Sequence, residues 1–183
     1  MTDFPKDLIL ENETILLRPL TEQDFSLLSP LTQEPELWEY FTHDLSKFEA
    51  FKPWALDHFE GKRLQFVIWD KKTDQLAGSS GFGNYSQRDQ RVEIGWTWIG
   101  KDFHGTGLNP SVKKLMLAYA FETLNLKRVE FKTDVLNLPA RKALIKLGAI
   151  EEGVLRSHTL LHHGRRRNTI YYSFLEEDWL KIR

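Results

Sequence analysis

The residues with the clearest chemical potential lie where a strand ends in a glycine-containing loop that leads into a helix. Residues 92–99 alternate as a strand does, and glycines follow at positions 100, 105 and 107. Pro110 then suits the first turn of a helix. Free amides and the helix dipole make such a junction attractive to anions, and glycine lets the backbone approach a diphosphate closely. The spacing therefore predicts a diphosphate site around Gly105 and Gly107, with an ordinary tight turn as the equally weighted alternative.

Two other phosphate motifs do not fit this loop. The glycines at 105 and 107 lack the third glycine of the dinucleotide-binding fingerprint. A Walker A loop would end in Gly-Lys-Ser/Thr, and no such sequence is present here. The glycines alone therefore do not identify the ligand.

A carboxylate stands in the strand that feeds the loop. Regular alternation would place Glu93, Gly95, Thr97 and Ile99 on one face, and Val92, Ile94, Trp96 and Trp98 on the other. A carboxylate near a ligand site can accept the proton that an attacking amine must lose, directly or through water. Glu93 is thus the candidate general base; the alternative is a carboxylate paired with Arg91 or Arg88 on the sheet.

The surrounding patterns predict one continuous α/β domain over residues 1–183, without repeats or linkers. Expected strands cover residues 14–17, 64–70, 76–85, 92–99, 128–134, 149–156 and 168–174. Expected helices cover 22–61 in pieces broken by prolines, a stretch from 110 onward, 137–147 and a final turn within 176–182. Asn137 would cap the helix that Gly148 ends. The aromatic residues between 38 and 59 are expected mostly in the core, with Trp38, Tyr40 or Phe41 as candidates to wall a substrate pocket.

Composition narrows the functions open to the chain. It has 183 residues, a net charge of −1, 41% hydrophobic residues and no cysteine. No global field attracts nucleic acid or an anionic membrane, and disulfides, thiolate zinc sites and a cysteine nucleophile are excluded. The first residues do not form a signal peptide and no apolar run is long enough to span a bilayer, so a soluble, cytoplasmic protein is expected.

Basic residues near the C-terminus suggest two further functions that the sequence does not favour. His158 and His162 lack converging acidic ligands, so no metal site is predicted. The three arginines at 165–167 are more typical of a solvated or substrate-facing turn than of a nucleic-acid site. His158 is expected either on a surface hairpin or in the wall of an acceptor pocket.

Several segments, in order, resemble one enzyme family. Residues 93–122, with an acidic strand residue, a glycine loop and a long helix, resemble the acetyl-CoA-binding core of the GNAT superfamily of N-acetyltransferases. Segments at 17–20, 128–134, 146–156 and 171–179 resemble its RimJ/RimL branch, so the likeness covers nearly the whole chain. The resemblance implies the GNAT acyl-CoA N-acyltransferase fold, which is mixed α/β (α+β). Its central twisted sheet is mostly antiparallel, has about seven strands, is splayed in the middle and is flanked by helices.

The resemblance also implies acetyl-CoA as the co-substrate. The backbone amides of the loop and of the helix start would hold its pyrophosphate, namely those of Gly105, Thr106, Gly107, Leu108 and Asn109. The pantetheine arm would pair with Trp98 and Ile99 as an added strand does. An amide near Thr97 or Trp98 would polarise the acetyl carbonyl.

Other positions would border the CoA arm or depart from the family pattern. Asn137 and Arg141 would border the arm from the far side of the splay, and Lys113, Lys114 and Lys142 are either partners of the 3′-phosphate or a solvated helix face. Asp102 stands where the family often has Gln or Arg, so it is expected to point to solvent. Ala140 replaces a serine that protonates the CoA thiolate in some relatives, so the general acid is unassigned.

The implied reaction is direct transfer of the acetyl group from acetyl-CoA to a primary amine, without a covalent enzyme intermediate. The branch resemblance points to a protein N-terminal amine, and a small amine such as a polyamine or an antibiotic is the alternative acceptor. The departures at Asp102 and Ala140 keep open a non-catalytic acyl-CoA-binding regulatory module. The resemblance also leaves room for a homodimer.

Overall fold

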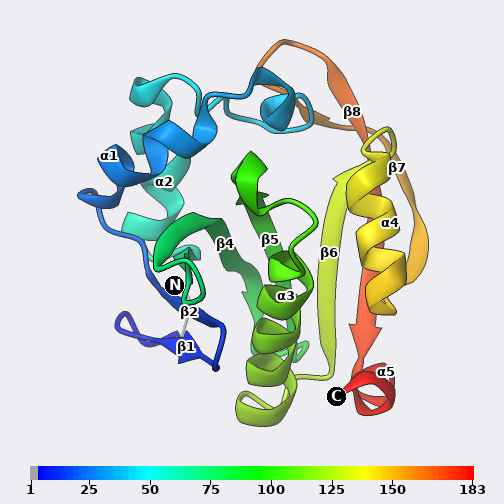
Figure 1. Ribbon diagram of the computed structural model, residues 1–183. Helices are drawn as coiled ribbons and strands as arrows, with labels where there is room; N and C mark the ends of the chain where they lie inside the picture. Colours follow the sequence, from blue (N-terminus) through cyan, green and yellow to red (C-terminus); the bar gives the residue numbers. More distant parts are fainter. Residues whose placement is uncertain (1–3) are drawn as a thin grey trace.

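The strands form one open sheet in the order β1-β2-β3-β4-β5-β6-β8-β7 (Figure 1). The structure is a computed structural model, and it describes residues 4–183. The strands are β1 (Leu10–Glu11), β2 (Ile15–Pro19), β3 (Leu64–Asp70), β4 (Gln75–Ser86), β5 (Arg91–Ile99), β6 (Arg128–Asp134), β7 (Ile150–Leu160) and β8 (Arg166–Leu175). All neighbours are antiparallel except the central pair β5 and β6.

The sheet matches the predicted mixed α/β architecture, with one strand more than the seven expected. The extra strand is β1, whose two residues are too few for an alternating pattern to reveal. The other seven occupy the predicted segments, and their ends differ by a few residues. The helices are α1 (Asp24–Leu28), α2 (Phe51–Phe59), α3 (Leu108–Ala118), α4 (Leu138–Leu147) and α5 (Glu176–Ile182).

Two hydrophobic clusters cover the two faces of the sheet. Alternation along β3 separates them, because Phe66 and Ile68 join the cluster under α3 while Val67 joins the cluster under α1 and α2. The second cluster contains the buried aromatic residues Trp38 and Trp54, as the sequence predicted for this stretch. The sheet is thereby held rigidly on both sides of its centre.

The segment between β2 and β3 is less helical than predicted. Only α1 and α2 are α-helical there, and short 3-10 turns at Ser29–Thr32, Pro35–Trp38 and Phe48–Ala50 occupy much of the rest. Two of these turns have a proline at their start, where its missing amide costs no helical hydrogen bond. Aromatic packing, not helical regularity, orders this segment.

The helices beside the central strands follow their local signals closely. α3 begins at Leu108, two residues before the predicted start, and continues into a π-helical turn at Tyr119–Thr123. The Oδ1 atom of Asn137 accepts a hydrogen bond of 3.2 Å from the amide of Ala140, so the predicted cap of α4 is confirmed. Gly148 ends that helix with φ +105°.

The central strands β5 and β6 pair over only three residues and then part. Their register runs from Arg91↔Arg128 to Glu93↔Glu130, although β5 continues to Ile99 and β6 to Asp134. Figure 1 shows the two strands diverging toward the loop that leads into α3. The predicted splay is therefore present, and Glu93 lies at its fork.

A bulge in β5 overturns the predicted alternation beyond residue 95. Trp96 has φ +50°, and one extra residue of β5 fits between the pairs Gly81↔Gly95 and Ser79↔Trp98. As a result Thr97, expected on the face of Glu93, contacts α3 instead. Trp98 also changes faces, because it packs in the cluster under α1 and α2 while Ile94 and Ile99 pack in the other cluster.

Candidate active site

The fork between β5 and β6 opens into a cavity of about 360 Å³. Two helices, both splayed strands and the hairpin β7–β8 contribute to its walls. Its lining includes Asn84, Glu93, Gly95, Thr97, Asn109, Lys113, Phe131, Lys132, Asn137, Ala140, Leu144, His158 and Arg167. Several residues singled out from the sequence thus meet in one place, namely Glu93, Thr97, Asn109 and Asn137.

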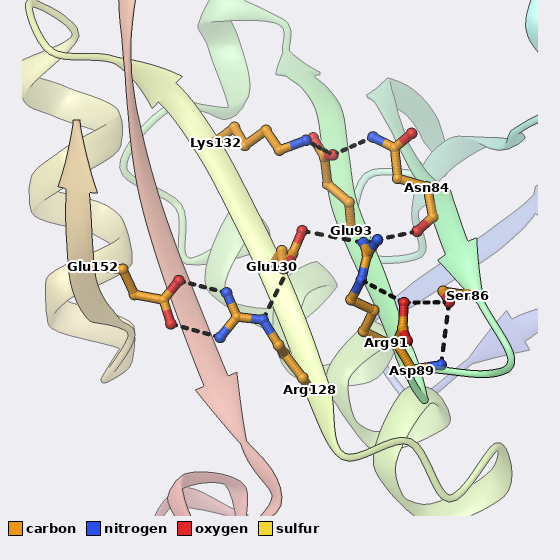
Figure 2. Close-up of polar contacts among 9 residues, drawn as sticks. All are labelled: Asn84, Ser86, Asp89, Arg91, Glu93, Arg128, Glu130, Lys132 and Glu152. Atoms are coloured by element: carbon orange, nitrogen blue, oxygen red, sulfur yellow. Dashed lines mark hydrogen bonds and ion pairs between the residues drawn. The ribbon is translucent and has the colours of Figure 1, made fainter. Parts of the chain in front are cut away.

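Glu93 is nearly buried at the fork, with 6% of its surface exposed. One carboxylate oxygen, Oε2, lies 2.5 Å from Nζ of Lys132 and accepts a hydrogen bond of 2.6 Å from Nδ2 of Asn84 (Figure 2). Among the described residues, neither Arg91 nor Arg88 forms the ion pair with Glu93 that the sequence offered as an alternative.

Lys132 is a site residue that the sequence did not identify. The parallel register places Glu93 beside Glu130, so Lys132 follows two residues later on the same side of β6. Burial alone would lower the pKa of Lys132, but the adjacent Glu93 carboxylate outweighs it and the pKa is raised. Lys132 therefore carries a charge and orients Glu93 through their ion pair.

A chain of charged groups ties the strands together below the fork (Figure 2). Arg128 forms a two-pronged pair with Glu152 of β7, and its Nε lies 3.0 Å from Oε1 of Glu130. Glu130 also lies 3.6 Å from Nη1 of Arg91 on β5. These contacts join residues of β5, β6 and β7 and pass over β8, so they fix the closed end of the fork while its other end is open.

The glycine loop presents backbone amides without partners. Gly105 and Gly107 have φ +76° and +86°, and no atom lies where their β-carbons would be. In the described part of the chain the amides of Gly105, Thr106 and Gly107 have no acceptor, and that of Leu108 has only a long contact of 3.4 Å to Thr106 Oγ1. Asp102 is exposed, as expected. The loop can therefore accept an anion.

The other residues proposed for the CoA arm are divided between the cavity and its surroundings. Oδ1 of Asn109 is buried and has no hydrogen-bond partner among the described residues. Trp98 and Ile99 are buried behind the lining, and the carbonyl of Ile99 lies 2.8 Å from Nε2 of His104. Arg141 does not line the cavity, because it donates to the carbonyl of Val135 at 2.9 Å and to Tyr172 at 3.1 Å.

The end of the cavity away from the helices is walled by polar and aromatic groups. Tyr40 and Phe41 line it, whereas Trp38 is buried behind them. His158 also lines it from β7, and Arg167 lines it from β8. Burial lowers the pKa of Arg167, which donates to the carbonyl of Tyr40 at 3.4 Å.

The remaining basic residues near the C-terminus form bonds within the chain. Arg165 lies 2.6 Å from Oδ2 of the buried Asp134, and Arg166 donates to the carbonyl of Ser157. His162 and His163 lie near backbone carbonyls of the 38–39 segment. Within residues 4–183, no group of His, Asp and Glu side chains could hold a metal ion, and no helix is long and apolar enough to cross a membrane.

Lys113 faces the sheet, not the solvent. Only 7% of its surface is exposed, while Lys114 and Lys142 are exposed. Its ammonium group donates to Thr97 Oγ1 and, at 3.3 Å, to Ser80 Oγ, and it lies 5.6 Å from the ring centre of Phe131. The part of the structure that is described offers it no carboxylate partner, and burial lowers its pKa to about 7. Its burial excludes the solvated helix face, which was one of the two alternatives for this residue.

An open sheet with a central fork, a carboxylate at the fork and an anion-binding loop beside it define a class of acyl-CoA-dependent transferases. Residues 14–150 match the family described as "Acetyltransferase (GNAT) domain", and the chain belongs to this family. It is therefore an acetyltransferase, and enzymes of this family take the acetyl group from acetyl-CoA.

Individual relatives agree with this assignment. The chain is 30% identical over 176 residues to "Uncharacterized N-acetyltransferase p20" of Bacillus licheniformis, covering 93% of this chain and 97% of the relative. It is 28% identical to "Putative ribosomal N-acetyltransferase YdaF" of Bacillus subtilis (strain 168), covering 92% and 94%. The crystal structure of a GCN5-related N-acetyltransferase from Brucella melitensis has the same fold, with a TM-score of 0.89, 23% identity and coverage of 97% of this chain and 83% of the other.

Proposed function

We propose that the protein transfers the acetyl group of acetyl-CoA to the N-terminal amine of a protein, with Glu93 as general base. The observation that carries this proposal is the position of Glu93 at the fork of β5 and β6, where its carboxylate lines the cavity. An acceptor ammonium must lose a proton before it attacks a thioester, and a carboxylate within reach, directly or through one water, can take it.

The loop before α3 supplies the proposed anion site for the CoA pyrophosphate. The unpartnered amides of Gly105, Thr106 and Gly107, with those of Leu108 and Asn109, would donate to its oxygens. The unpartnered Oδ1 of Asn109 would accept a hydrogen bond from the arm, which gives this buried atom the partner it lacks. Trp98 and Ile99 would present strand backbone to the pantetheine, and Asn137 would border it from α4.

The bulge in β5 supports the assignment of the acetyl position. Trp96 holds a left-handed conformation that is costly for a bulky side chain, and such strain concentrates where a site needs a particular backbone direction. The amides of Thr97 and Trp98 follow directly. One of them would donate to the acetyl carbonyl oxygen as negative charge develops on it.

The charges around the cavity favour one class of acceptor amine over another. Glu93 is the single carboxylate among the described residues that line it, and Lys132, Arg167 and Lys113 are basic. A polyamine would meet these cations without an acidic pocket to bind its other ammonium groups, whereas a peptide brings one amine and a neutral backbone. The name of the YdaF relative, a ribosomal N-acetyltransferase, favours a protein acceptor too. A cytoplasmic location fits this pair of substrates, and the homodimer stays a prediction.

The test is CoA release, measured with a thiol reagent, from acetyl-CoA and a panel of amines. The panel contains lysine-free peptides with a free N-terminus, the same peptides with a formylated N-terminus, spermidine and an aminoglycoside. We expect turnover with the free peptides alone, and we expect Glu93→Gln to lower kcat at least about 100-fold while the acetyl-CoA affinity is kept. Full turnover in Glu93→Gln would remove Glu93 as the base, and turnover with spermidine but no peptide would reassign the acceptor.

A further inference from the structure

The wall of the cavity that α4 provides offers no proton to a leaving thiolate. Ala140 and Leu144 line it, and the Asn137 side chain accepts a hydrogen bond from the start of its own helix. The cavity does contain an ionisable donor on its other side, because Lys113 reaches it from α3. The family resemblance implies a donor on α4, where this chain has Ala140, whereas Lys113 lies on a different helix.

Lys113 is held in the splay by groups from three strands. Thr97 of β5 and Ser80 of β4 accept its hydrogen bonds, and the Phe131 ring of β6 lies on the far side of the gap. The two hydroxyls are also bonded to each other at 2.8 Å, so they form a fixed pair beneath the ammonium. The bulge at Trp96 creates this arrangement, since regular alternation would turn Thr97 away from α3.

A buried lysine without a carboxylate is costly for the fold. Neither hydroxyl carries a negative charge, and the described residues supply no ion pair to Lys113. Such a residue is suited to a ligand on which negative charge appears during a reaction. The proposed thioester position lies beside Thr97, the residue to which Lys113 donates.

We propose that Lys113 is the general acid that protonates the CoA thiolate as it leaves. This inference rests on the proposed function. When the acceptor nitrogen has bonded to the acetyl carbon, the carbon–sulfur bond breaks and its electron pair goes to sulfur. One N–H bond of the Lys113 ammonium breaks and an S–H bond forms. Lys113 is left as a neutral amine and takes a proton from solvent before the next cycle.

The strength of this acid suits the task. Burial lowers the pKa of Lys113 to about 7, so its ammonium gives up a proton more readily than that of an exposed lysine. The other titratable groups that line the cavity are Tyr40, Glu93, Lys132, His158 and Arg167. Lys132 is paired with Glu93 and is thereby occupied.

The first test measures free CoA in complex with the protein, so it needs no turnover. The ultraviolet absorbance of the thiolate gives the pH at which the bound thiol ionises. We expect the wild type and Lys127→Met to bind CoA with a thiol that ionises at lower pH than in water, because the Lys113 amine takes up the thiol proton and the ammonium formed stabilises the thiolate. In Lys113→Met this lowering is lost. An unchanged thiol titration in Lys113→Met would overturn the proposal.

The second test uses turnover and separates a proton donor from a fixed charge. We expect Lys113→Met to lower kcat about 100-fold. This is at the low end for loss of a general acid, because thiolate is a fair leaving group. The affinity for acetyl-CoA should change less than about threefold. Lys113→Arg keeps the charge but cannot give up a proton, so its kcat stays low. Lys127→Met is the matched control and keeps full activity, because Lys127 is exposed, pairs with Glu176 and does not line the cavity.

The outcomes distinguish this inference from the proposed function. Full kcat in Lys113→Arg would show that Lys113 acts as a fixed charge and not as a proton donor. Acetylation of Lys113, found by mass spectrometry, would show that it is an acetyl acceptor. Either result overturns the proposal. A wild type that releases no CoA with any amine would refute the proposed function instead, while the thiol titration would still test Lys113.

Discussion

The carboxylate of Glu93 and the ammonium of Lys132 lie 2.5 Å apart across the fork between β5 and β6. Their side chains are only 8% and 18% exposed, so solvent screens the pair weakly. In Lys132→Met the carboxylate loses the ion pair that holds it at the fork. We expect this variant to lower kcat at least about tenfold while the Kd of acetyl-CoA is kept, because the proposed base is no longer held in position.

Lys127→Met is the matched control for this pair. Lys127 lies 2.6 Å from Glu176, but both side chains are about half exposed and far from the cavity lining. Exposed pairs of this kind contribute little, so its kcat and stability should match the wild type. If Lys132→Met keeps the kcat of the wild type, Lys132 does not position Glu93 in the working enzyme.

Gly107 tests the proposed diphosphate site through its backbone conformation. At φ +86° an alanine is strained by about 1–2 kcal/mol, and Gly107→Ala should raise the Kd of acetyl-CoA at least about tenfold by turning the loop amides away. Gly164→Ala is the matched control, because Gly164 has φ +89° and equally open surroundings in the turn between β7 and β8. Both variants should lose similar stability, and calorimetry should find weaker binding in Gly107→Ala alone. Equal affinities of the two variants for acetyl-CoA would mean that the diphosphate does not bind at this loop.

Much of the fold follows from signals that lie close together in the sequence. Period-two alternation located seven strands, and the cap at Asn137 with the glycine at 148 bounded α4 correctly, because both signals depend on a few neighbouring residues. The broken segment before β3 was harder, since its short turns are ordered by aromatic packing across the chain. The splay came from the family resemblance and not from any local pattern.

The site shows where sequence reasoning stops. Glu93 could be found as a carboxylate beside a glycine loop, but its partner Lys132 depends on the register of two strands about 40 residues apart in the chain. The two alternatives for Lys113, a partner of the 3′-phosphate or a solvated helix face, did not include burial against the sheet. Its burial follows from where α3 crosses the sheet and from a single extra residue at Trp96, neither of which leaves a pattern in the sequence.

The bulge itself can be tested through the glycine that accommodates it. A β-carbon at Gly83 would overlap ring atoms of Trp96, and the guanidinium of Arg63 lies 4.7 Å from the centre of that ring. Gly83→Ala should therefore lower the free energy of unfolding by about 1–3 kcal/mol and reduce kcat, because Trp96 and the amides after it must shift. The matched experiment is a double-mutant cycle measured by urea unfolding. Because Trp96→Leu makes room for the new methyl group, Gly83→Ala should lose less stability in the Trp96→Leu background than in the wild type. Strictly additive effects would mean that Trp96 is not what Gly83 accommodates.

The buried charge of Lys113 predicts a stability that depends on pH in a defined direction. Burial lowers its pKa from 10.5 to about 7, so between these values the unfolded chain binds a proton here that the folded chain does not. Stability from this group therefore rises as pH increases across that window, and it is lowest below pH 7, where the folded chain must keep the charge. Lys113→Met removes this cost, which amounts to about 1.4 kcal/mol for each pH unit by which burial lowers the pKa. Thermal unfolding should show Lys113→Met most stabilised relative to the wild type below pH 7, and the difference should shrink toward pH 10.5. The control is Lys114→Met, at an exposed lysine, which should show no such trend. A difference that is constant with pH would mean that Lys113 titrates as it does in the unfolded chain and that its burial carries no electrostatic cost.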